Sequence, residues 1–168
     1  ALESGLTRIV DKTAASPAGA QPAALNVRRE GAAVAVSGDG YGTRFEVNFD
    51  SATGALTGYR YGDVDYLAGG LPCFDRLDAD KGWGWYDTYA KLRGAKLTLQ
   101  RFDVLAADYG VVVDVDYALE GVAVSNASIR YTVWPCGTLR VDFRAHIDKS
   151  VGGVPRAGIE FTVPAGFE

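Results

Sequence analysis

Two closely spaced carboxylates in a glycine-rich segment are the first residues here that could do chemistry. Asp78 and Asp80 lie two positions apart and are followed by Gly82. At this spacing both side chains can point into one cavity, as a general acid and base or as ligands of a hard cation such as Ca²⁺. An EF-hand loop needs a further oxygen ligand where this chain has Gly82, which argues against the cation. A solvated loop explains the same aspartates, and we expect no metal and no other cofactor.

The small number of histidines and cysteines, and their positions, limit which catalytic and metal sites the chain could form. His146 is the single histidine, and it lies between Ala145 and Ile147 in an alternating run that is typical of an ordinary strand. A Ser-His-Asp or Cys-His triad would have to use this residue. Cys73 and Cys136 are too few for a disulfide scaffold, and neither has the neighbours that a zinc site needs. They could form one bridge, but we favour two buried free thiols.

The composition narrows the class of protein. The 168 residues carry a net charge of -4, and 48% of them are hydrophobic, which is typical of a globular domain. Sequence-blind binding of nucleic acid needs a basic face, and a bilayer span needs an apolar run of ~18 residues. Since the chain has neither, we expect neither nucleic acid nor a membrane as a partner. Methionine is absent and the chain begins with Ala1, so we expect a processed chain or part of a longer one.

The elements that must position the two aspartates are predicted to be strands. A count of 21 Gly, 9 Tyr and 7 Phe favours strands and turns over a helical bundle. Short apolar or alternating runs recur every ~8–12 residues, as in an antiparallel β-sandwich. The predicted strands span 33–36, 45–49, 55–61, 64–67, 97–104, 110–119, 127–134, 138–148 and 159–163, with a tight turn at 135–137. The fold class is therefore all-β.

Two regions lack this regular recurrence of short strands. Residues 1–32 contain a small-residue, proline-containing stretch without periodicity and are predicted to form a linker or extended arm, which leaves 33–168 as the sandwich domain. Within the glycine-rich segment, Trp85, Tyr89 and Leu92 have helical spacing, and Gly94 suits a helix C-cap. One short helix is predicted near 85–93.

An ordered set of motifs covers most of the chain. The run FEVNFDSATGALTGYRYGDVDYL over 45–67 is followed by LPCF at 71–74, by Arg76 and by DADKG at 78–82. Near the end, VPRAG at 154–158 precedes Val163 and Pro164. This order, with these gaps, resembles the small-chain, or fifth, domain of the family 2 β-galactosidases from about residue 33 to 168. The resemblance implies an antiparallel supersandwich like that of galactose mutarotase.

The sequence departs from the family pattern at two points. In the family loop an aromatic residue precedes the arginine and an asparagine separates the aspartates, whereas this chain has Asp75 and Ala79. The chain also stops at Glu168, before the family's Trp-Tyr-Gly stretch. It therefore resembles roughly the first half of the domain, and we expect the sandwich to be incomplete.

The resemblance implies that the glycine-rich segment approaches a sugar pocket. Carboxylates and arginine bind sugar hydroxyls through charge-assisted hydrogen bonds, and an indole face packs on the C–H surface of a galactoside. Trp83 and Trp85 match no family motif but suit that platform, although Trp85 could instead pack the short helix onto the sheet. The predicted substrate-binding residues are Arg76, Asp78, Asp80, Gly82, Trp83 and Trp85.

Three functions remain open. Glycoside hydrolysis needs two carboxyl groups about 5–10 Å apart across the scissile bond, and in the family these lie on a separate barrel domain. We therefore predict no catalytic residue on this chain, and an accessory domain that braces the barrel and lends a loop to the sugar pocket. The alternatives are a non-catalytic carbohydrate-binding module and a structural or interaction sandwich in a larger assembly. The expected partners are a β-galactoside or other carbohydrate, and further hydrolase domains or a partner chain that cover the open sandwich.

Overall fold

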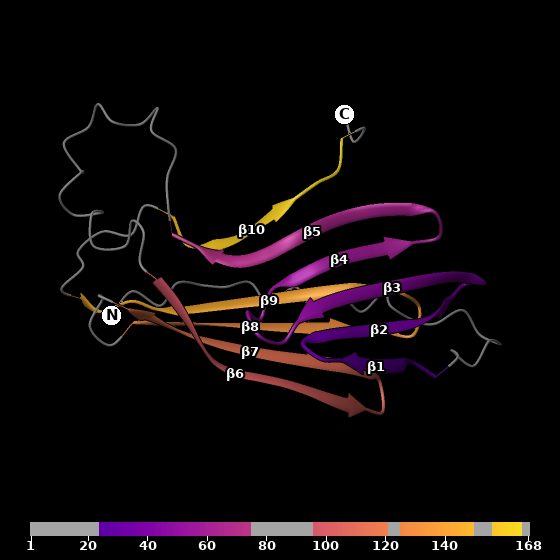
Figure 1. The fold of residues 1–168 in the computed structure, drawn as a ribbon, viewed down its shortest axis with the longest axis horizontal. Coiled ribbons are helices and arrows are strands. Elements are labelled where there is room, and N and C mark those ends of the chain that lie inside the picture. The colour runs from indigo at the N-terminus through magenta and orange to yellow at the C-terminus, as the bar shows by residue number, and fades with distance from the viewer. Residues whose placement is uncertain (1–23, 75–95, 121–124, 150–155, 166–168) are drawn as a thin grey trace, which may run out of the picture.

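The described part of the chain forms two antiparallel sheets (Figure 1). The computed structural model describes residues 24–74, 96–120, 125–149 and 156–165. The six-stranded sheet has the order β1 (Asn26–Glu30), β2 (Ala33–Gly40), β3 (Thr43–Asp50), β4 (Leu56–Tyr61), β5 (Val64–Cys73) and β10 (Gly158–Thr162). The four-stranded sheet has the order β6 (Lys96–Ala107), β7 (Gly110–Glu120), β8 (Asn126–Val133) and β9 (Leu139–His146). This architecture confirms the predicted all-β antiparallel sandwich.

The core lies between the two sheets and follows the alternation of the sequence. Successive side chains of a strand point to opposite faces, so every second residue can enter the core. Phe45, Val47 and Phe49 of β3 are at most 1% exposed, as their alternation with polar residues predicts. The other sheet contributes Val111, Val113, Val115 and Tyr117 from β7 and Ile129, Tyr131 and Val133 from β8. Burying each of these side chains contributes roughly 1.5–3 kcal/mol, so this layer is the main source of stability.

Tyrosine hydroxyls join the two sheets through the core. Tyr131 of β8 donates a hydrogen bond to the carbonyl of Gly70 in β5 at 3.2 Å. Tyr117 of β7 donates to the carbonyl of Thr53 at 3.0 Å, and Tyr59 of β4 donates to that of Gly137 at 2.7 Å. Each bond satisfies a phenol that would be costly to bury alone, and each fixes one sheet relative to the other.

Two features differ from the sequence-based expectations, and one further prediction is not tested. Residues 26–30, which the pattern places in the linker or arm, form β1 against β2. All five side chains of β1 are exposed, so the strand is held by backbone pairing and shows no apolar period. β5 continues to Cys73, beyond the predicted end at 67, and pairs with β10 from Cys73 opposite Gly158 to Ala68 opposite Thr162. The helix predicted near 85–93 lies outside the described residues.

The cysteines and His146 fall on strands or turns. Cys73 and Cys136 form no disulfide with each other, as favoured above, but both are half-buried rather than buried. His146 ends β9 and is exposed, which fits the ordinary strand histidine. Among the described residues no helix has the length and apolarity required to cross a bilayer.

Candidate functional site

The predicted substrate-binding residues all belong to the connection between β5 and β6. Arg76, Asp78, Asp80, Gly82, Trp83 and Trp85 fall within 75–95, which lies outside the described residues. Their arrangement therefore stays a prediction. What the structure describes is the framework from which this connection starts and to which it returns.

Phe74 holds the start of the connection. Its side chain is 7% exposed and packs with Leu119 of β7 and Ala127 of β8 in a second, smaller apolar cluster. Phe74 also lies beside Phe143, with ring centroids 6.3 Å apart. The residue before the connection is thus buried against three strands of the other sheet.

Lys96 anchors the end of the connection, where the chain enters β6. It opens β6 opposite Glu120, and its ammonium lies 3.3 Å from that carboxylate. The hydroxyl of Thr98 donates a second hydrogen bond to Glu120. The Thr98 hydroxyl and the Lys96 ammonium together hold the pKa of Glu120 below its usual range. Both ends of the connection are therefore anchored at the end of the sandwich where β7 ends and β8 begins (Figure 1).

A pocket with a mixed polar and apolar lining lies on the outward face of the four-stranded sheet near this end. Its volume is about 540 Å³, and its polar lining comes from Gln100, Asp116, Ser125, Asn126 and Ser128. Ser125 is buried: its carbonyl accepts a hydrogen bond from the Leu119 amide, and its hydroxyl accepts one from the Asp148 amide.

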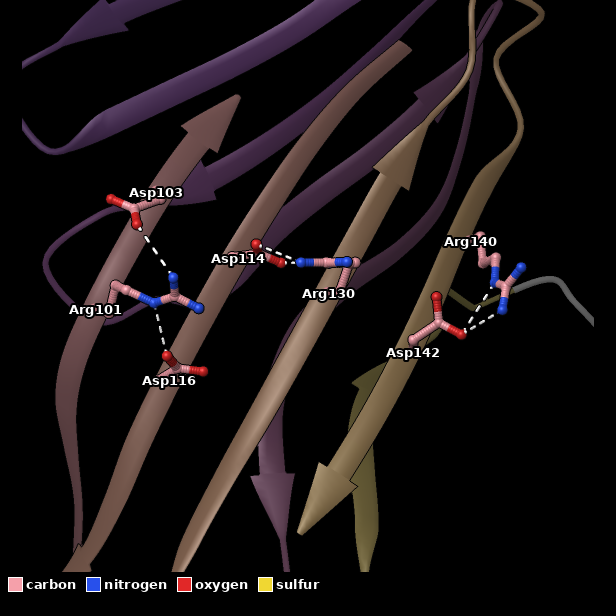
Figure 2. Close-up of polar contacts among 7 residues, drawn as sticks. All are labelled: Arg101, Asp103, Asp114, Asp116, Arg130, Arg140 and Asp142. Carbon is pink, nitrogen blue, oxygen red and sulfur yellow. Dashed lines mark hydrogen bonds and ion pairs between the residues drawn. The ribbon is translucent and has the colours of Figure 1, made fainter. Parts of the chain in front are cut away.

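The same outward face carries a ladder of charged side chains, shown in Figure 2. Strand register places Asp103, Asp114, Arg130 and Asp142 in one row across β6, β7, β8 and β9. The next row consists of Arg101, Asp116, Ser128 and Arg144. Opposite charges on neighbouring strands stabilise a sheet, and here they meet in both rows.

Arg130 and Asp114 form the most ordered pair of the ladder. The Nε and Nη2 atoms of Arg130 donate to the two carboxylate oxygens of Asp114 at 2.7 and 2.8 Å. This bidentate contact lowers the pKa of Asp114 and raises that of Arg130. Asp114 is only 6% exposed, so the contact also satisfies a carboxylate that is largely removed from water.

Two further arginines complete the ladder. Arg101 donates from Nε to Asp116 at 2.7 Å and also contacts Asp103 at 3.5 Å. Arg140 donates from Nε and Nη2 to one oxygen of Asp142 at 3.0 and 2.7 Å. Figure 2 shows these groups spread across all four strands of the sheet.

The sequence-based search did not single out this ladder. A signal was present, because Asp114 and Asp116 alternate with buried valines, and Arg140, Asp142 and Arg144 alternate along the β9 run. Alternation places such residues on one face of a strand. It does not give the pairing register, so it could not show which charges meet.

The framework and the order of its motifs agree with one known family. A family model described as beta galactosidase small chain matches residues 41–168. The chain belongs to this family. The match to the β-galactosidase small-chain family runs from the turn before β3 to the end of the chain and includes the connection 75–95, so the resemblance inferred from the motifs is confirmed. A comparison with curated proteins found no match.

Proposed function

We propose that this chain is an accessory domain of a β-galactosidase-like glycoside hydrolase, in which it braces the catalytic barrel and lends residues 75–95 to the sugar pocket. The observation that carries the proposal is the family match over residues 41–168, a range that includes β5, the connection and β6. The anchors at Phe74 and Lys96 support it, because a binding loop is most precise when rigid elements hold both of its ends.

The proposed chemistry of the connection is binding rather than bond cleavage. Arg76, Asp78 and Asp80 would hydrogen-bond sugar hydroxyls, and Trp83 and Trp85 would pack on the sugar's C–H surface. The acid and nucleophile would come from the catalytic domain. Binding energy gained in this way positions the substrate for the step catalysed there.

The open side of the sandwich supports the proposed role as part of a larger enzyme. The core-facing residues of β9, Leu139, Val141 and Phe143, are only half-buried, whereas their counterparts on β8 are at most 1% exposed. On the other sheet, Val163 just beyond β10 is 55% exposed. We propose that further domains of the hydrolase cover this side, since exposed apolar surface of this kind marks an interaction site.

The decisive experiment uses the complete hydrolase that contains this chain. We expect Asp78→Asn and Asp80→Asn each to lower kcat/KM for a nitrophenyl β-galactoside by about tenfold or more. Asp63→Asn, in the exposed turn between β4 and β5, is the matched control and should leave kcat/KM unchanged. Wild-type kinetics in both loop variants would refute the role of the connection. Hydrolysis by the 168-residue chain alone would refute the accessory role.

A carbohydrate-binding module is the second candidate. It is favoured by the departures from the family loop at Asp75 and Ala79, which fit a chain that kept sugar binding without a catalytic partner. The two functions differ in where affinity resides. A module binds lactose through residues 75–95 as an isolated chain, so Asp78→Asn abolishes that binding, whereas a lending loop needs the rest of the pocket. A purely structural sandwich would bind no sugar through residues 75–95 in either form.

A further inference from the structure

The outward face of the four-stranded sheet contains a second hollow, which shares Asp116 and Ser128 with the pocket described above and extends from them toward the end opposite the anchors of the connection. Its volume is about 530 Å³, within the range of about 300–1,000 Å³ typical of small-ligand sites. Tyr109 and Trp134 line it near the hairpin between β6 and β7. Lys96 lies at the far end of β6, which spans roughly 35–40 Å at ~3.3 Å per residue. The aromatic end of the hollow is therefore distant from the base of the connection.

The charges that line this hollow balance one another. It contains Arg101, Arg130, Arg140 and Arg144 together with Asp114, Asp116 and Asp142, and Asp103 pairs with Arg101 at its border. Four guanidinium groups thus face four carboxylates. An anion in the hollow would lie close to the carboxylates, and a cation would lie close to the arginines. Neither ion therefore gains a favourable electrostatic energy. A neutral ligand meets no such penalty.

Within the described structure, the hollow contains both hydrogen-bond acceptors and hydrogen-bond donors that the ladder does not use. Asp116 and Asp142 each use one carboxylate oxygen in the ladder and keep the other available within the described structure. Arg144 is exposed and forms no ion pair with a described residue. Acceptors and donors therefore stand on adjacent strands, a pattern that suits a ligand rich in hydroxyl groups, each of which both donates and accepts.

Two aromatic side chains complete the lining. Tyr109 is 56% exposed and Trp134 is half-buried, so both rings remain accessible beside the polar ladder. Exposed aromatic faces next to preorganised polar groups provide the two kinds of contact that a sugar ring makes.

We propose that this face is a binding site for a neutral oligosaccharide, with Tyr109 and Trp134 packing on the sugar rings and Arg144, Asp116 and Asp142 bonding the hydroxyls. The site uses none of the residues of the connection 75–95. It therefore goes beyond the proposed lending loop and does not depend on it. Its role would be to hold a glycan chain on the domain surface, with no bond made or broken.

The test is an NMR titration of the full 168-residue chain with lactose, cellotriose and β-1,4-galactotriose. We expect saturable shifts of the Tyr109, Trp134 and Arg144 resonances with at least one of these sugars. Tyr109→Ala and Arg144→Gln should each weaken that binding by about tenfold. Both residues are exposed, so these variants should fold. Arg44→Gln, on an exposed position of β3, is the matched control and should leave the affinity unchanged.

The outcomes separate this site from the connection. Asp78→Asn should leave the shifts of the sheet face unaltered, and its effect on hydrolysis is a separate measurement. The proposal fails if none of the three sugars shifts the face resonances, or if Tyr109→Ala and Arg144→Gln bind as well as the unaltered chain. It also fails if phosphate, and no sugar, produces the shifts, since the ligand would then be an anion.

Discussion

Among single residues, Asp114 shows how this fold stabilises a buried charge. It is the one charged side chain that is buried among the described residues, and Arg130 covers both of its oxygens. The hydrogen bonds from Arg130 lower the pKa of Asp114 against the opposing effect of burial. Its charged form is therefore more favourable in the folded than in the unfolded chain, which makes the free energy of unfolding depend on pH.

The sign of that dependence gives a prediction. A carboxyl whose folded pKa is lowered contributes its full stability above the unfolded pKa of about 3.9 and loses it as pH falls through the folded value. We expect Asp114→Asn to cost about 1–2 kcal/mol at pH 7 and to flatten the loss of stability below pH ~4. Urea unfolding at pH 7, 5, 4 and 3 measures both effects.

Asp142→Asn is the matched control for this substitution. Asp142 lies in the same row of the ladder but is only half-buried, and Arg140 contacts it through a single oxygen. Its replacement should change the free energy of unfolding by less than about 0.5 kcal/mol. Equal losses for the two variants would contradict the special role of Asp114.

Among the elements, the turn between β3 and β4 is stabilised by local hydrogen bonds and also packs against the core. The Asp50 carboxylate accepts hydrogen bonds from the Ala52 amide at 2.9 Å and the Thr53 hydroxyl at 2.8 Å, which lower its pKa. Gly54 follows with a φ of 76°, where side chains are disfavoured. A Cβ on Gly54 would also meet the Tyr117 hydroxyl and a methyl group of Val115. The turn therefore requires glycine for two reasons.

A pair of glycine substitutions separates these reasons. Gly31 has a similar φ of 59°, but a Cβ there would meet nothing within 4 Å. Gly31→Ala should cost about 1–2 kcal/mol from backbone strain alone. Gly54→Ala should cost about 1–3 kcal/mol more, because it must also displace Tyr117 or Val115. Thermal and urea unfolding of both variants provide the comparison, and equal losses would show that the core accommodates the added methyl group.

At the scale of the whole molecule, stability depends on how the two sheets are held together. Apolar packing is non-directional, so it favours contact between the sheets without fixing their relative position. The hydroxyls of Tyr117, Tyr131 and Tyr59 add directional bonds from one sheet to the other. Burial raises the pKa of both Tyr117 and Tyr131, so these phenols stay protonated donors throughout the physiological range.

Removing one such bond tests this view. Tyr131→Phe deletes the donor to the Gly70 carbonyl while keeping the ring that packs against Phe49 at a centroid distance of 5.1 Å. We expect a loss of about 1–2 kcal/mol, or roughly 2–6 °C in Tm, from differential scanning calorimetry. Tyr109→Phe, at an exposed position, is the control and should leave Tm unchanged. If Tyr131→Phe also left Tm unchanged, the hydroxyl would contribute nothing to holding the sheets together.

Local sequence determined the fold class and most of the strands. Phe45, Val47 and Phe49 alternate with polar residues, and Pro135 to Gly137 interrupt the last hairpin, so periodicity and turn chemistry within a few residues predict both. The order of motifs from residue 45 onward also determined the family. These properties are local, and they can be recognised without knowledge of which strands pair.

Tertiary structure decided the features that depend on pairing. β1 has only exposed side chains, so its place beside β2 follows from backbone hydrogen bonds that leave no apolar pattern. The ladder that brings Asp114 opposite Arg130 exists only in one register, and a slip of one residue would turn the charges of the slipped strand toward the core. Register is set by the burial of whole strands against the other sheet, and that energy belongs to contacts distant in sequence.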